Sequence, residues 1–110
     1  MDNKKIFEKW LESFRWNPKE KKLRSRSAIQ NYLSYLNNIE KDLDIVEGSI
    51  YRIKKVNRLN VLEDDLRASD KFRFRKIKQQ HNYLSALHTY KHLVEILETK
   101  KSKLKKAIND

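Results

Sequence analysis

Cysteine is absent from this 110-residue chain, and glycine and proline occur only once each. The chain can therefore form neither a disulfide nor a thiolate metal site. Tight β-turns need the positive φ of glycine or the fixed φ of proline, so this scarcity disfavours a β-sandwich or a β-barrel. No apolar run approaches the ~20 residues of a membrane span, and no apolar segment follows the N-terminus as a signal peptide requires. We expect a single-domain cytoplasmic protein.

Basic residues are abundant: 26 lysines and arginines stand against 15 aspartates and glutamates, which gives a formal net charge of +11. In a small folded domain this charge favours a polyanionic partner, nucleic acid first and a membrane surface second. A lysine-rich surface that only keeps the protein soluble is the alternative explanation. The positions of the charges must distinguish the two.

Apolar residues recur at the spacing of helices in four stretches. The expected stripes are Ile6, Phe7, Trp10, Leu11 and Phe14; Ile29, Tyr32, Leu33, Leu36, Ile39 and Leu43; Leu59, Leu62 and Leu66; and Tyr83, Leu84, Leu87, Tyr90, Val94 and Leu97. The sequence thus predicts an all-α fold, a compact bundle of four main helices with room for a fifth short one. This domain is expected to cover residues 6–97, with residues 98–110 as a basic extension of the last helix or a basic tail.

Short local signals mark the expected ends of these helices. The expected caps are Asp2 or Asn3 for the first helix, Ser27 with Gln30 as a capping box for the second, and Asn57 for the third. Loops are expected at residues 16–24, at 44–49 around Gly48 and at 69–74. The stretch from Ser49 to Ile53 suits either an extended segment or a short helical turn.

Acidic residues leave two long gaps, one between Glu20 and Glu40 and one between Asp70 and Glu95. Opposite their apolar stripes, the helices in these gaps carry asparagine, serine, threonine and histidine instead of the usual glutamate and lysine. Those residues are poorer helix formers, so their use calls for a reason. Short amides and hydroxyls can approach base edges and phosphates closely, whereas a carboxylate would repel the phosphates. The same faces would also suit a protein partner.

Basic clusters stand at the start of both acid-free helices, where free backbone N–H groups also favour a phosphate. From these features we predict a nucleic-acid-binding surface in which the cations position the backbone and the polar helix faces contact the bases. Its expected residues are Lys21, Lys22, Arg24, Arg26, Ser27, Gln30, Asn31, Arg73, Arg75, Lys76, Lys78, His81, Asn82 and Ser85. Phe72 and Phe74 lie among the cations and could stack on bases, although anchoring the loop to the core is the favoured role.

Two segments, Ile29–Leu36 and His81–Tyr90, contain the patterns Tyr-Leu-Ser-x-Leu and Tyr-x-Ser-Ala-Leu-x-x-Tyr. In these patterns the chain resembles the helical core-binding (SAM-like) domain of phage-type tyrosine recombinases and the related helical N-terminal module of restriction endonucleases. The resemblance covers about residues 6–97. It implies a helical domain that clamps duplex DNA with its second and last helices nearest the groove. The catalytic domain of a recombinase does not follow within this chain, so the resemblance implies either a piece of a longer protein or a relative that binds without cutting.

Catalytic and metal-binding patterns are weak. His88 and His92 have the spacing of a helical zinc site, but a protease-type site would need glutamate where Thr89 stands. The carboxylates of Glu63-Asp64-Asp65 diverge around a helix, and the sequence shows no partnered histidine or second acidic motif that would complete a metal nuclease site. We therefore expect no catalytic residue, no metal, no cofactor and no enzymatic activity in this chain.

The sequence as a whole favours a non-catalytic DNA-binding domain, with duplex DNA as the partner and no membrane contact. The alternative is a basic helical interaction protein with a protein partner, such as a phage-encoded inhibitor of a host protein that handles nucleic acid.

Overall fold

The computed structural model describes the backbone of residues 3–13, 16–17, 22–23 and 26–109, and the side chains of residues 3–12 and 26–100. The helices are α1 (Lys4–Ser13), α2 (Arg26–Asp42), α3 (Val56–Ala68), α4 (Asp70–Arg73) and α5 (Ile77–Asn109), with a 3₁₀ helix η1 (Ser49–Arg52) between α2 and α3. Two-residue strands β1 (Trp16–Asn17) and β2 (Lys22–Leu23) pair antiparallel. The predicted all-α bundle is confirmed.

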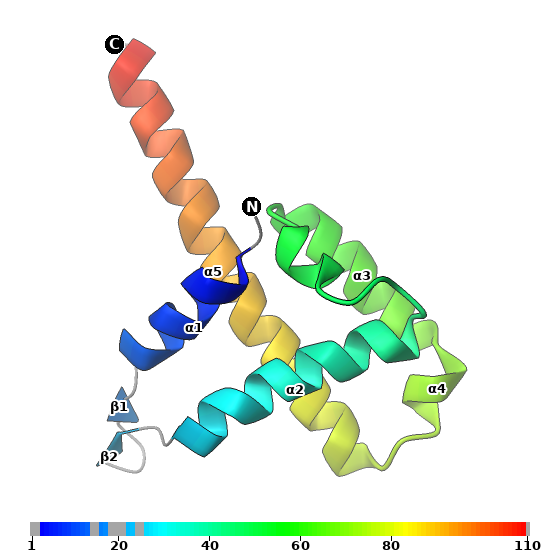
Figure 1. Cartoon of the computed structure of the whole chain (residues 1–110). Coiled ribbons are helices and arrows are strands. Elements are labelled where there is room, and N and C mark those ends of the chain that lie inside the picture. The colour runs from blue at the N-terminus through cyan, green and yellow to red at the C-terminus, as the bar shows by residue number, and fades with distance from the viewer. Residues whose placement is uncertain (1–2, 14–15, 18–21, 24–25, 110) are drawn as a thin grey trace.

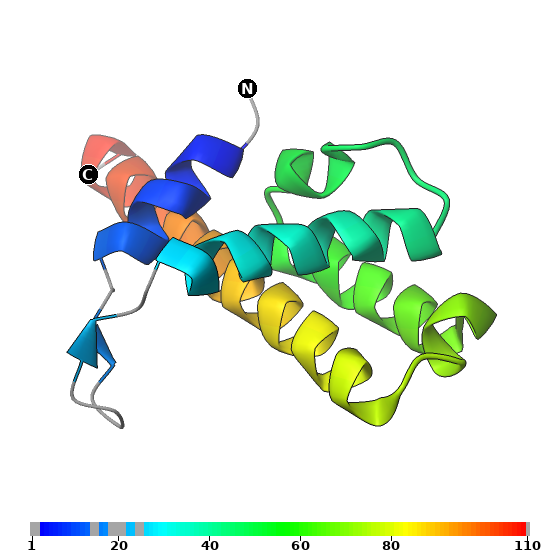
Figure 2. The same ribbon diagram turned by 60° about the horizontal axis from the view of Figure 1, so that its bottom comes forward.

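Helix α5 is the axis of the molecule (Figure 1). Helix α2 crosses α5, and these two helices make the most extensive contact between elements. Helix α1 lies beside the C-terminal part of α5, and α3 packs on the opposite side of α5. The final turns of α5 project beyond the bundle. The backbone of the predicted C-terminal extension is helical to Asn109. Figure 2 shows the crossing of α2 and α5 from below, with the β1–β2 pair at one end and α4 at the other.

The core gathers around Tyr90, which α5 carries into the centre of the bundle. Its ring makes edge-on contacts with Phe7 at 5.3 Å and Tyr51 at 5.6 Å between centroids. Its hydroxyl donates to the Ile53 carbonyl (3.1 Å) and accepts from the Nδ2 amide of Asn3 (3.2 Å). A buried tyrosine hydroxyl needs such partners. Asn3 thus precedes α1, as predicted for a cap, but its side chain ties the N-terminus to α5.

The predicted apolar stripes are largely the observed core. Buried members include Phe7 and Leu11 on α1, Leu36 and Ile39 on α2, the complete leucine stripe of α3, and Tyr83, Leu87, Tyr90 and Val94 on α5. Phe14, from the first stripe, lies outside the described residues. The predicted turn at Gly48 is also present, with a left-handed φ of 81° that suits glycine.

Several predicted helix ends are wrong, and tertiary contacts explain two of them. Asn57 does not cap α3: the helix begins at Val56, whose N–H donates to the Glu98 carboxylate of α5 (3.2 Å). The predicted loop at 69–74 contains the one-turn helix α4, which carries Phe72 into the core. Helix α2 begins at Arg26, one residue before Ser27, a difference within the fraying of helix ends.

Two further segments, residues 16–24 and 49–53, also contain regular structure. Within the predicted basic loop at 16–24, Trp16 pairs with Leu23 and Asn17 with Lys22, which makes this segment partly a β-pair. The ambiguous segment after Gly48 is helical. The Ile50 N–H (3.1 Å) and the Ser49 hydroxyl (3.4 Å) both donate to the buried Glu40 carboxylate.

Candidate nucleic-acid interface

The crossing of α2 and α5 brings together polar residues from the two acid-free segments. Asn31 from α2 and Asn82 and Ser85 from α5 face one hollow of about 200 Å³, which we call the α2–α5 notch. Its other lining residues are Ala28, Tyr32 and Tyr35. Among the residues that the structure describes, no carboxylate lines it. Three predicted binding residues, separated by about fifty positions in the chain, are therefore neighbours in space.

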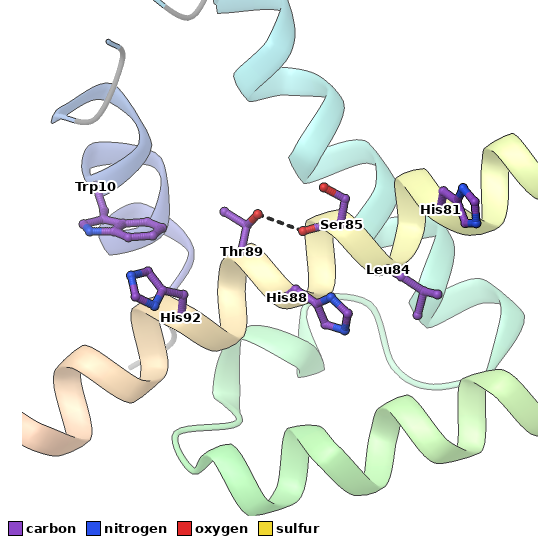
Figure 3. Close-up of a pocket in the computed structure, with 7 residues that line it drawn as sticks. All are labelled: Trp10, His81, Leu84, Ser85, His88, Thr89 and His92. Carbon is purple, nitrogen blue, oxygen red and sulfur yellow. Dashed lines mark hydrogen bonds between the residues drawn. The ribbon is translucent and has the colours of Figure 1, made fainter. Parts of the chain in front are cut away.

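A larger open groove of about 710 Å³ adjoins the notch and shares Ser85 with it. We call it the α5 groove; it is lined by Trp10, His81, Leu84, Ser85, His88, Thr89 and His92. Figure 3 shows its histidines along one side of α5 and Trp10 reaching over from α1. Positions 81, 88 and 92 repeat at one-face helical spacing, which a sequence search for a histidine stripe could have found.

Trp10 was predicted to be a core residue, and it is only half-buried. Its ring lies 5.8 Å from that of His92 between centroids, and it forms the α1 wall of the groove (Figure 3). The Thr89 hydroxyl is held by the helix, because it donates to the Ser85 carbonyl (2.8 Å). Of the polar groups here, the imidazoles of His81 and His92 and the Ser85 hydroxyl are therefore best placed to meet a ligand.

Glu63 on α3 closes the edge of the groove next to His88. Its Oε1 lies 2.6 Å from His88 Nε2 and 3.2 Å from Lys91 Nζ, and its Oε2 accepts from Arg67 at 3.2 Å. Burial alone would raise the pKa of Glu63, but the hydrogen bonds from these three side chains outweigh it and leave the pKa below its usual value. Glu63 thus links α3 to α5 through its contacts with His88 and Lys91.

We expect Glu63 to make the protein less stable in acid. A carboxylate whose pKa is lower in the folded chain stabilises the fold above its unfolded pKa, and this contribution is lost as the pH falls through the folded value. The free energy of unfolding should therefore decrease as the pH is lowered below about 4.5, the ordinary pKa of a glutamate side chain. In Glu63→Gln, urea denaturation at pH 6 and pH 3 should show a smaller difference than in the wild type. An unchanged difference would contradict the assignment, and Glu95→Gln, an exposed change on α5, is the control.

Arg75 does not lie free for a phosphate, contrary to the sequence prediction. Its Nε and Nη2 donate to both carboxylate oxygens of Asp42 at 2.7 and 2.6 Å, and its guanidinium lies 4.9 Å from the Tyr83 ring centroid. The hydrogen bond to Asp42 raises the pKa of Arg75 above its usual value. The same residue type at the neighbouring position, Arg73, is exposed.

The other predicted cations divide into three groups. Arg73, Lys76 and Lys78 are exposed, and no ion pair involves them among the described side chains. Arg26 pairs with Glu12 at 2.8 Å, but both side chains are exposed, so the pair is weak and can exchange for a phosphate. Lys21, Arg24 and the side chain of Lys22 lie outside the described residues.

Gln30 is exposed, but it lies on the other side of α2 from Asn31. It lines a separate hollow whose walls include the carboxylates of Glu8, Glu40 and Glu47. The acid-free gap in the sequence is therefore not acid-free in space, because α1 and the α2–η1 turn bring acids to this side. Gln30 is removed from the candidate interface, while Ser27 stays exposed in the first turn of α2.

In the part of the chain that the structure describes, no three histidine or carboxylate side chains gather in a metal-binding arrangement. Among the same residues, no helix has the length and apolar character needed to cross a bilayer.

Comparison with protein-family models, with curated proteins and with solved structures finds no match to this chain.

Proposed function

We propose that the chain is a non-catalytic DNA-binding domain that holds duplex DNA against the α2–α5 notch. The observation that carries the proposal is the meeting of Asn31, Asn82 and Ser85 in a hollow without carboxylates. Asparagine can contact adenine through two hydrogen bonds, and serine accepts or donates to any base edge. The resemblance to recombinase core-binding domains agrees with this choice of helices.

Cations flank this polar centre on both helices. Lys78 lies four residues before Asn82, so both side chains project from the same side of α5 about one turn apart. Arg26 begins α2 five residues before Asn31. The arrangement suits two phosphate strands on either side of a groove, with the amides between them. Cations of this kind position the duplex, and the amides carry any sequence preference.

We expect binding to duplex DNA to weaken steeply with salt. Each neutralised phosphate contributes roughly −0.9 to the slope of log K against log salt, so about four to eight contacts give a slope of roughly −4 to −7. Fluorescence anisotropy of a labelled duplex at increasing salt measures it. Lys78→Ala should weaken binding to every sequence and lower the slope by about one. Asn82→Ala should leave non-specific affinity unchanged but cost about 1–3 kcal/mol at one base position of a selected site.

Gln30→Ala is the matched control, because it removes an exposed amide that lines a separate hollow of α2. A slope near zero would contradict the proposal and favour a protein partner for the same faces. The proposal also fails if Lys78→Ala binds normally and Asn82→Ala loses no affinity at a selected site, while Lys103→Ala with Lys105→Ala abolishes binding. DNA would then be held by the C-terminal end of α5 alone.

A further inference from the structure

The junction between α4 and α5 displays the most exposed large apolar side chain among the described residues. Phe74 is 88% exposed, and Ile77, three residues later, is 70% exposed. The sequence favoured an anchoring role for both aromatic residues of this segment. Only Phe72 has that role, since it is buried against Tyr83. Phe74 must be explained separately.

The backbone on both sides of Phe74 is firmly held. Phe72 is anchored in the core before it, and Arg75 is bound to Asp42 after it. The Gln80 side chain donates to the carbonyls of Arg73 (3.2 Å) and Arg75 (2.8 Å), and the N–H of Phe74 itself donates to Asp70 (2.9 Å). An apolar ring presented from so constrained a turn needs no further ordering on binding, which favours affinity.

The charges around Phe74 identify the kind of partner. Arg73 and Lys76 flank it in the chain and Lys78 follows; all three are exposed, and none of them forms an ion pair with another described side chain. Lys71, by contrast, is paired with Asp44 at 2.9 Å. An exposed aromatic side chain with unpaired basic residues close to it in the chain is complementary to stacked bases between phosphate strands.

We propose that Phe74, supported by Ile77, inserts between two base pairs of duplex DNA held at the α2–α5 notch and kinks it there. This inference deepens the proposed function and rests on it. Ile77 begins α5 five residues before Asn82, a rise of about 7.5 Å along the helix. That rise places Ile77 about two base-pair steps from the amide, and Phe74 precedes Ile77 by three residues at the junction of α4 and α5. Apolar side chains inserted at a step unstack it and bend the duplex by about 20–90°.

The experiment uses duplexes with 2-aminopurine placed at successive positions and a donor–acceptor dye pair at the ends. Wild-type binding should raise 2-aminopurine fluorescence at one step and shorten the distance between the dyes. Phe74→Ala should abolish both signals and weaken binding about tenfold, as loss of one stacked aromatic contact does. Phe74→Leu should keep much of the bend, because leucine is also an effective wedge. Val61→Ala, an exposed apolar change on α3, is the matched control and should keep both signals.

The outcomes separate this inference from the proposed function. If the wild type binds duplex DNA with the expected salt slope but neither signal changes, or if Phe74→Ala retains both signals, insertion is wrong and DNA binding stands. If the wild type binds no duplex at all, both are wrong. Binding to vesicles of anionic phospholipid that is lost in Phe74→Ala, without duplex binding, would assign the junction to a membrane surface and overturn the inference.

Discussion

Replacing Arg75 by alanine is expected to destabilise the protein by about 3–5 kcal/mol, the usual loss when one partner of a buried ion pair is removed. The Asp42 side chain is only 2% exposed, and Arg75 donates to both of its oxygens. Without the guanidinium, the Asp42 carboxylate would lose its counter-ion and both of these hydrogen bonds at a largely buried position. The stacking of Arg75 over Tyr83 would be lost as well. This pair is what joins the end of α2 to the start of α5.

Chemical denaturation in urea measures the effect, with Arg73→Ala as the control. Arg73 is a neighbouring arginine with an exposed side chain, so its loss should change stability by less than about 0.5 kcal/mol. A second test replaces both partners, as Asp42→Asn with Arg75→Met, which removes the two charges together. The double variant should be less destabilised than Arg75→Ala. Equal stability of Arg75→Ala and Arg73→Ala would show that the pair is not a structural link.

The Leu87→Ala variant should lose about 2–5 kcal/mol of unfolding free energy. Leu87 is fully buried on α5, within the core that α1, α2 and α3 share. Truncation removes the transfer energy of the side chain and leaves a cavity, and the spread of the estimate reflects how far the neighbours can collapse into it. The predicted loss is similar to that of Arg75→Ala but arises from packing instead of charge.

Leu84→Ala is the control for this variant, because Leu84 lies on the same helix but lines the open α5 groove. It should cost clearly less than Leu87→Ala in the same urea denaturation experiment. A loss below about 1 kcal/mol in Leu87→Ala would mean that the core is loosely packed. It would also weaken the assignment of the α5 faces on which the DNA-binding proposal depends.

Local sequence pattern was enough to predict the four longer helices and most of their buried sides. The leucines at 59, 62 and 66 define α3, and Tyr83, Leu87, Tyr90 and Val94 define the inner side of α5, because helical spacing and apolarity are local properties. The single glycine marked a turn for the same reason. The polar outer sides of α2 and α5 were also visible as stretches without acids. These features depend on residues that are neighbours in the chain.

The tertiary structure alone decided which of those polar residues share a surface. Asn31 meets Asn82 and Ser85, whereas Gln30, the adjacent residue, faces carboxylates from other elements. Arg75 is drawn to a buried aspartate 33 positions away while Arg73 stays exposed. The sequence by itself thus determined the helices and the overall basic charge. Which cations and amides are free for a ligand depended on long-range contacts, because charge pairing acts through space and the acids concerned come from distant segments.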